Sequence, residues 1–450
     1  MSQVKLFGNS RSAARVAKGG RKKEKKVKQK KPLKVLAIVL TVILCLEGLY
    51  FFCIYSQNSF VTKWRNIYIQ TAMSTMRHKW LATYFIPGDV IDEVITRQSN
   101  AAGSQIGIVS TWTKPDEPAK TPDDESTKVV NADIETIEPD VMSPEEQAEV
   151  EKAAFYELFW ELDQDTMQAY IDDNPHVLNN GWSKIYINEA GFDDEGTSIM
   201  TTMGEQVLAI DAANQILLLR VEGSGYRGVL AVAKDPAQLS IEMSQHIGSA
   251  GQLTGEIAEA HDGVLAMVAN GFIDVDAQGN QGNGNGGIIA GYAMSNGESY
   301  GSHFGWGYKR IELHEDNLFY IKDASDPVGE DCTDATEFQP ALIIDGETFY
   351  DGFWIEKNPR ACIGQSDKYE ILMLVIEGRM PFEGSVGTDV NTCTGILERH
   401  NCMQAMNVDG GTSAMMWFDG EYVIRCSNAN IRYTGGRTVP NAFVYKRISE

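Results

Sequence analysis

The stretch "AMNVDGGTSAMMWFDG", residues 405–420, contains an apolar run that stops abruptly at Asp409, Gly410 and Gly411. The run before the aspartate is suited to a buried strand. Two glycines after an aspartate let the backbone turn sharply and approach a ligand closely. We therefore expect the amide groups of Gly410, Gly411 and Ser413 to hold an anion at the end of a strand.

A simple hairpin turn is the alternative, because it is the commoner meaning of an Asp-Gly pair. The second Asp-Gly pair, in "FDGEYV" at residues 418–423, fits a hairpin well. At Asp409 the additional glycine and the Thr412–Ser413 pair favour a functional site instead.

Composition and charge limit the class of protein. The 450 residues are 43% apolar with a formal charge of −23, which suits a folded chain with one large core or two smaller ones. Residues 1–34 hold thirteen Lys and Arg against the single acid Glu24, so their +12 leaves −35 for the rest. This acidic remainder argues against nucleic acid as a partner. The basic arm is expected to face anionic lipid headgroups.

Residues 35–55, "VLAIVLTVILCLEGLYFFCIY", are apolar over the length that a helix needs to cross a bilayer. A cleaved signal peptide is the competing interpretation, but the run is long for one and no small-residue cleavage site follows. We expect an uncleaved signal anchor. The positive-inside rule then predicts a single-pass protein of the cell membrane with a cytoplasmic N-terminus and with everything after Tyr55 in an extracellular position.

The rest of the chain divides by composition. Residues 56–103 show helical periodicity broken at "IPGD" and predict a helical stalk. Residues 104–142, with nine acids and three lysines, predict a flexible acidic linker. Ser143 begins a capping box and a helical lead-in over 143–180. Short strands from 181 to 450 predict an α+β domain with a mixed β-sheet and flanking helices.

Cysteines and histidines give no metal or redox signature. The five cysteines after residue 55 show no CxxC spacing, and Cys393 with Cys402 is the most local candidate pair for a disulfide. Asp274 and Asp276 resemble the start of a calcium loop, but its twelfth position is Asn285 rather than Glu. We expect no metal and no cofactor, with calcium or magnesium left open.

Several catalytic signatures are absent: the GxSxG elbow, the HExxH zinc helix and the GxxxxGK phosphate loop. The chemistry must then come from polar residues at the ends of apolar strands. We expect the segments near residues 270, 360, 409 and 437 to converge around one solvent-accessible hollow.

The C-terminal segment resembles the phosphodiester glycosidase family, the relatives of the lysosomal uncovering enzyme that removes N-acetylglucosamine from a phosphodiester. The family pattern there is approximately N-L-D-G-G-x-S-S, followed by G-R-x-V-P-N-A. The residues that meet it are Asn407, Asp409, Gly410, Gly411, Ser413, Gly436, Arg437, Val439, Pro440 and Asn441.

Two further motifs extend the resemblance over about residues 205–448, in consistent order. "NPRACIG", with the later "IEGRMPFEGSVG", resembles the family's P-R-T-A-I-G strand and its D-G-R turn. "VLAMVANGF" is similar to the family's I-N-x-G-F-F segment. One departure is Val268, which aligns with the usual Asn of this segment, while Asn270 stands two residues on and on the same side of a strand.

The resemblance implies hydrolysis of a sugar-1-phosphodiester at the anomeric carbon. Asp409 is the expected carboxylate that stabilises positive charge on the sugar, Asp274 is the second candidate, and Arg360 completes the catalytic set. Guanidinium groups suit the phosphate because they bind it bidentately. The expected substrate-binding residues are Asn270, Arg379, Asn407, Gly410, Gly411, Ser413, Arg437 and Asn441.

The leading interpretation is thus a membrane-anchored hydrolase that acts on a glycan or sugar-phosphate substrate in cell-envelope or exopolysaccharide metabolism. The alternative is a non-catalytic glycan-binding or polysaccharide-assembly protein on the same fold, motivated by Val268. A third possibility is a stalked surface protein in which the Asp-Gly-Gly segment is only a turn.

Overall fold

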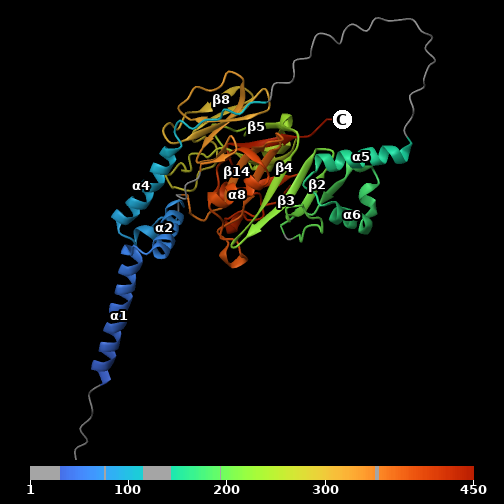
Figure 1. Cartoon of the computed structure of the whole chain (residues 1–450). Helices are drawn as coiled ribbons and strands as arrows, with labels where there is room; N and C mark the ends of the chain where they lie inside the picture. Colours follow the sequence, from blue (N-terminus) through green and yellow to red (C-terminus); the bar gives the residue numbers. More distant parts are fainter. Residues whose placement is uncertain (1–30, 76–77, 115–142, 193, 350–353, 450) are drawn as a thin grey trace, which may run out of the picture. The chain divides into compact units, whose positions relative to one another are not determined.

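The computed structural model of the chain describes residues 31–75, 78–114, 143–192, 194–349 and 354–449 (Figure 1). The chain divides into two compact units, Met1–Gln57 and Asn58–Glu450. Most of the predicted basic tail (1–34) and residues 115–142 of the predicted linker lie outside the described residues.

The described part of the first unit, residues 31–57, contains one helix, α1 (Lys31–Tyr55). Its part from Lys34 to Tyr55 is the only described helix that is long and apolar enough to cross a membrane. An N-terminal signal sequence would have the same length and composition. The helix predicted over 35–55 is therefore present, and it is a candidate membrane span.

The described residues of the segment predicted as a helical stalk, 56–103, form three helices: α2 (Ser59–Met73), α3 (Trp80–Thr83) and α4 (Gly88–Ser104). The Asn58 side chain caps α2 by accepting from the amides of Phe60 and Val61. α2 is fastened to the rest of the second unit, since the Gln70 side chain accepts a hydrogen bond from the Ile355 amide at 3.3 Å. These helices are thus part of the domain rather than a spacer below it.

The first residues of the predicted flexible linker (104–142) are also held against the domain. The Gln105 side chain exchanges two hydrogen bonds with the Ala341 backbone, at 2.9 and 3.2 Å. The Asp345 carboxylate accepts from the Ser110 hydroxyl at 3.0 Å and from the Thr111 amide at 2.7 Å. The prediction of a flexible linker is wrong for residues 105–112, because these polar groups have partners that only the folded domain supplies.

The helical lead-in consists of α5 (Pro144–Leu158) and α6 (Gln164–Asp173), followed by 3-10 turns at Pro175–Leu178 and Trp182–Lys184. The capping box that the sequence predicts at Ser143 is present, with the Glu146 side chain bound back to the Ser143 amide. Phe155 and Phe159 are buried against the central sheet.

The central sheet has nine strands among the described residues, all paired antiparallel. In spatial order they are β1 (Tyr186–Asn188), β2 (Gln206–Asp211), β3 (Ile216–Gly223), β4 (Tyr226–Ala233), β15 (Ile371–Ile376), β14 (Arg360–Ser366), β16 (Cys402–Asn407), β12 (Ala341–Ile344) and β13 (Glu347–Thr348). Alternate residues point to opposite faces, so Leu218 joins one core while Leu217 and Leu219 join another. The middle strands read as continuous apolar runs because both faces are covered.

Two five-stranded sheets lie on one side of this sheet. One is β18 (Glu421–Tyr422), β17 (Met416–Phe418), β6 (Gly263–Val268), β19 (Asn441–Lys446) and β5 (Leu239–Met243). The other is β10 (Phe319–Asp323), β9 (Lys309–His314), β11 (Cys332–Phe338), β7 (Tyr292–Ser295) and β8 (Glu298–Gly301). α7 (Thr254–Ala260) packs on β6.

Helices α5, α6 and α8 (Val390–Arg399) cover the other face of the central sheet, with side chains such as Met167 and Leu397 in its core. The predicted α+β fold with flanking helices is confirmed. All seven cysteines are free thiols, so Cys393 and Cys402 do not form the disulfide that their proximity in sequence suggested.

Candidate active site

The ends of several strands meet at one edge of the central sheet. β15 and β16 both pair antiparallel with β14, so they run in the same direction and finish where β14 begins at Arg360. The segments that follow β15 and β16 carry Arg379 and Asp409. β6 of the neighbouring sheet ends close by, since the Asp409 amide donates to the Ala269 carbonyl at 3.3 Å.

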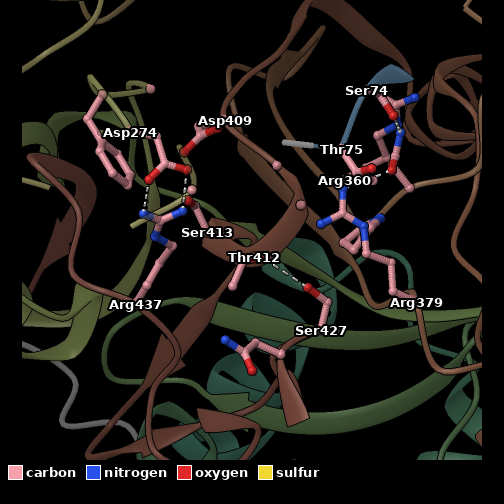
Figure 2. A pocket seen from close by; sticks show the side chains of 18 of the residues that line it. Ser74, Thr75, Asp274, Arg360, Arg379, Asp409, Thr412, Ser413, Ser427 and Arg437 are labelled. Atoms are coloured by element: carbon pink, nitrogen blue, oxygen red, sulfur yellow. Dashed lines mark hydrogen bonds and ion pairs between the residues drawn. The ribbon is translucent and has the colours of Figure 1, made fainter. Parts of the chain in front are cut away.

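These segments surround a pocket of about 810 Å³. Figure 2 shows Asp274, Asp409, Ser413 and Arg437 on one side and Arg360, Arg379, Ser74 and Thr75 on the other. The convergence expected for the segments near 270, 360, 409 and 437 is therefore present. Of the eleven residues predicted from the sequence, the pocket is lined by Asp274, Arg360, Arg379, Asn407, Asp409, Gly410, Gly411, Ser413 and Arg437.

The Asp-Gly-Gly segment carries the chain from β16 in the central sheet to β17 in a smaller one, so it is not a hairpin turn. A side chain at Gly410 would place its Cβ 2.8 Å from the Pro359 carbonyl oxygen, and Gly411 has a left-handed φ of 62°. Both glycines are needed for this close passage. By contrast Asp419 and Gly420 do connect the paired strands β17 and β18, as the sequence indicated.

The predicted anion site made of backbone amides is not formed. The Gly411 amide donates to the Pro359 carbonyl at 3.0 Å, and the Ser413 amide donates to the Gly410 carbonyl at 3.1 Å. The Gly410 amide donates to the Asp409 carboxylate. These donors are already used within the turn, so they stabilise the turn and the carboxylate rather than a ligand.

Asp409 has an unusual acidity. Burial at the base of the pocket raises the pKa of its carboxyl from 3.8 to about 6, because a buried carboxylate loses hydration. A hydrogen bond from the Ser413 side chain, the Arg437 charge and the Gly410 amide each oppose this rise, while the Asp274 charge adds to it. The side chain remains partly accessible from the pocket. A carboxyl with such a pKa can accept and release a proton near neutral pH.

Asp274 is held by Arg437 in a bidentate ion pair, with N–O distances of 2.6 and 2.9 Å. The Arg437 guanidinium also lies over the Phe272 ring, 4.3 Å from its centroid. The pair fixes both side chains at the pocket wall, and Arg437 is close enough to Asp409 to lower the pKa of that carboxyl. Asp274 is thus placed to orient Arg437.

Arg360 is occupied by protein partners. It is buried and forms an ion pair with the buried Glu356 at 3.0 Å, and its Nε donates to the Thr388 carbonyl at 3.2 Å. Its charge is therefore largely neutralised before any substrate arrives. The predicted catalytic role is less well supported by this geometry than a role in positioning the pocket wall.

We expect Arg360→Met to lower the free energy of unfolding by about 3–5 kcal/mol, because the Glu356 carboxylate would stay buried without its partner. Thermal unfolding of the purified full chain measures this loss. Pairing the change with Glu356→Gln should restore much of the stability. A stable Arg360→Met variant that no longer binds substrate would instead return Arg360 to the binding site.

Arg379 differs from the other arginines of the pocket. Within the described residues it forms no ion pair. Its side chain donates one hydrogen bond there, from Nη2 to the Asn358 side chain at 3.0 Å, and its buried Nε has no partner. Burial and the adjacent Arg360 charge lower the pKa of its guanidinium. The guanidinium lies against Gly411, 3.3 Å from where a Cβ on that residue would stand. The positive charge of Arg379 is therefore not compensated by an ion pair within the described residues, and an anionic ligand would supply that partner.

Two of the predicted substrate contacts lie below the pocket rather than in its wall. Asn270 and Asn441 are fully buried and bind each other, with the Asn441 amide donating to the Asn270 carbonyl oxygen at 2.9 Å. Asn270 also accepts from Thr336 and donates to the Tyr292 carbonyl. Their hydrogen-bonding capacity joins β6 to β19 and β7, which leaves no sugar contact for them. Asn407 does reach the pocket.

One wall of the pocket consists of residues that were not predicted from the sequence. Ser74, Thr75 and His78, from the segment between α2 and α3, line it. The Ser74 hydroxyl accepts a hydrogen bond at 2.9 Å from the Asn358 amide, whose oxygen binds Arg379. No signal in residues 56–103 pointed to the site, because these residues carry no motif and were interpreted as a stalk.

The polar groups of the calcium-like loop hydrogen-bond to one another. The Asp276 carboxylate accepts from the Asn280 side chain and the Asn280 amide, both at 2.8 Å, and from the Gln278 amide at 2.9 Å, which lowers its pKa. Asp274 faces Arg437. Among the described residues, the one cluster with metal-ligand spacing is Glu312, His314 and Cys332, but the Glu312 carboxylate is already paired with Arg310 and Lys322.

The family model of the phosphodiester glycosidases matches residues 262–446, which include both aspartates and all three arginines of the pocket. The resemblance noted in the sequence is thereby confirmed for this segment. No curated protein matches the chain.

Solved structures that match part of the chain include the catalytic domain of zebrafish N-acetylglucosamine-1-phosphodiester alpha-N-acetylglucosaminidase, auto-inhibited by its pro-peptide, and a hypothetical protein from Synechocystis. The zebrafish domain is 15% identical, with a TM-score of 0.41 over 52% of this chain and 82% of that one. The Synechocystis protein is 12% identical, with a TM-score of 0.34 over 55% of this chain and 65% of that one.

Proposed function

We propose that the second unit is a glycosidase that hydrolyses a sugar-1-phosphodiester at the anomeric carbon, with Asp409 and Arg379 as its principal groups. The observation that supports the proposal most is that Asp409 and Arg379 line different sides of one pocket. Arg379 is a cation without an ion-pair partner among the described residues, and Asp409 is a carboxyl with a pKa of about 6. The match of residues 262–446 to phosphodiester glycosidases supports the same substrate class.

Arg379 is proposed to bind the phosphate. A phosphodiester carries one negative charge, and a guanidinium can donate two parallel hydrogen bonds to its oxygens. When the bond between the anomeric carbon and the bridging oxygen breaks, its electron pair goes to the phosphate, which leaves as a monoester. The adjacent charge of Arg379 stabilises this growing negative charge. Phosphate is a good leaving group, so little proton donation is required.

Asp409 is proposed to act on the other side of the breaking bond. Its carboxylate stabilises the positive charge that develops on the sugar and accepts a proton from the attacking water, whose oxygen bonds to the anomeric carbon. A pKa of about 6 suits a base that works near neutral pH. Asp274 and Arg437 are positioning residues in this scheme, since their ion pair keeps a positive charge beside Asp409.

Isotope labelling tests the bond that breaks. The full chain, purified in detergent, would be given an N-acetylglucosamine-1-phosphodiester in ¹⁸O-labelled water. We expect free sugar and a phosphomonoester, with the label in the sugar. Label in the phosphomonoester would show cleavage of the P–O bond and overturn the proposal. Saturable binding without product would assign the non-catalytic glycan-binding alternative.

The pH dependence follows from the role of Asp409 as a base. A base must be ionised, so kcat/KM is expected to rise with pH through an inflection near 6. The Ser413 side chain lowers this pKa by hydrogen bonding, so Ser413→Ala should move the inflection upward. Ser427→Ala, which alters another serine of the pocket wall, is the matched control and should not move it. A rate that falls with rising pH would make Asp409 an acid instead.

The context of the reaction is also a proposal. α1 is assigned as the membrane anchor, with the N-terminus in the cytoplasm and the glycosidase outside, because the basic residues precede it. A glycan or sugar-phosphate of the cell envelope or of an exopolysaccharide is then the substrate within reach. Protease treatment of intact cells tests this topology, since only an external domain would be digested.

A further inference from the structure

Six aromatic side chains on α2, on α3 and just after α3 are exposed. These segments follow the candidate membrane span and belong to the second unit. Tyr84 is 81% exposed and Trp64 is 57% exposed. We call these side chains the aromatic face. They are Phe60, Trp64 and Tyr68 of α2, Trp80 of α3, and Tyr84 and Phe85 just after it.

The spacing on α2 puts Phe60, Trp64 and Tyr68 on one side of the helix, four residues apart. The Tyr68 hydroxyl donates to the Leu81 carbonyl at 2.7 Å, which ties α2 to α3. The other side of the pair is buried, with Ile69 and Ala82 inaccessible to solvent. The aromatic face is therefore held outward by a built scaffold.

The charge of this region differs from that of the whole chain. No Asp or Glu occurs between residues 48 and 88, in a protein with a formal charge of −23. Lys63 on α2 and Lys79 before α3 are exposed, and Arg65 is half-buried. Exposed aromatics beside basic residues, on a segment that itself carries no acid, complement an anionic lipid surface, although α4 adds Asp92 and Glu93 nearby.

The short connection between α1 and α2 indicates that a bilayer crossed by α1 would lie beside the aromatic face. Only Ser56, Gln57 and Asn58 separate the end of α1 at Tyr55 from the start of α2. If α1 crosses the bilayer, Phe60 must lie within a short reach of the headgroups. Trp and Tyr are enriched at that depth, where an apolar ring and a polar edge are both accommodated.

We propose that the aromatic face binds the surface of the anionic bilayer that α1 enters. The same α2–α3 pair contributes Ser74 and Thr75 to the pocket wall, so its membrane contact would hold the pocket at the bilayer surface. The lipid contact itself does not depend on the proposed hydrolysis and can be tested without a substrate.

Tryptophan fluorescence tests the contact in the full chain. α1 contains no tryptophan, so quenching reports only on the second unit. The protein would be reconstituted in vesicles of phosphatidylcholine and phosphatidylglycerol, with lipid brominated near the headgroup end of its acyl chains. We expect strong quenching in the wild type. In Trp64→Phe/Trp80→Phe, which keeps the aromatic rings but removes the probes, the quenched fraction should fall to the level of the six remaining tryptophans.

Trp306→Phe is the matched control, because Trp306 is 66% exposed but lies over Gly103 near the far end of α4. That position is about 22 Å along α4 from the start of this helix at Gly88. This variant should keep the wild-type quenching. Equal quenching in the wild type and in Trp64→Phe/Trp80→Phe would overturn the proposal. A second outcome would also overturn it: these two tryptophans are protected from acrylamide but are not quenched by brominated lipid. Protein rather than lipid would then cover the aromatic face.

Lipid charge separates an electrostatic contact from mere proximity. Lys63→Glu/Lys79→Glu is expected to reduce quenching several-fold on vesicles with phosphatidylglycerol and to change it little on neutral vesicles. Quenching that is the same in this variant on both kinds of vesicle would overturn the anionic specificity.

Discussion

Asp409→Asn is expected to lower kcat by roughly 10²–10⁴-fold, because the amide can neither accept a proton from water nor stabilise positive charge on the sugar. The measurement is release of free sugar from an N-acetylglucosamine-1-phosphodiester by the full chain. Asp419→Asn is the control, since it changes the same residue type in an Asp-Gly turn that lies between β17 and β18, at the surface. Equal turnover in wild type and Asp409→Asn would remove Asp409 from the mechanism.

The same variant should be more stable than the wild type. The folded pKa of Asp409, about 6, lies above its unfolded value of 3.8, so at pH 7 ionisation costs the folded state about 3 kcal/mol. This cost is fully present above pH 6 and disappears as the pH falls toward 4, because the carboxyl is then neutral in both states. Asp409→Asn is therefore expected to unfold at a higher temperature at pH 7 and to lose that advantage at pH 4. A carboxylate retained at such a cost is typical of a functional site.

Arg379→Met is expected to lower kcat/KM for the phosphodiester by roughly two orders of magnitude, as for the loss of charged hydrogen bonds worth about 3 kcal/mol. KM should rise because phosphate is bound in the ground state too, and kcat should fall because its charge grows in the transition state. Guanidinium added to the solution should restore part of the rate. Arg447→Met, at an exposed surface ion pair, is the control.

Stability distinguishes this effect from damage to the fold. Arg379 has no ion-pair partner among the described residues, so its replacement leaves no described carboxylate without a partner. Replacement of Arg360, by contrast, leaves Glu356 unpaired. Its left-handed φ of 60° would be shared by Met at the same position, which keeps the backbone strain equal. Arg379→Met with an unchanged melting temperature and unchanged kcat/KM would exclude this residue as the phosphate ligand.

The convergence of separate polar segments on one pocket was predictable from the sequence because the ends of strands can be recognised in it. Each apolar run ends in a polar or glycine-rich segment, and the resemblance joined these segments in one family pattern. Residues near 270, 360, 409 and 437 indeed surround one pocket. The fold class followed from the same alternation of short strands with a few helices.

The hydrogen-bond and ion-pair partners of the pocket residues were not predictable from the sequence. Arg360 and Arg379 look equivalent in sequence, but Arg360 is bound to the buried Glu356 whereas Arg379 has only Asn358. Asn270 and Asn441 match the family motifs, yet they lie 171 residues apart in sequence and bind each other below the pocket. The amides after Asp409 were expected to be free because nothing in the sequence shows that the Pro359 carbonyl lies opposite them. Such pairings depend on register between distant strands.

Because residues 58–112 are attached to the domain, residues 143–450 are not a complete folded unit without them. Gln70 and Gln105 each bind backbone groups that lie more than two hundred residues further along the chain. A recombinant version that starts at Ser143 would therefore lack one side of its own cleft and leave the Ala341 and Ile355 amides without these partners. A single cut between residues 115 and 142 would, for the same reason, leave two fragments that these hydrogen bonds hold together.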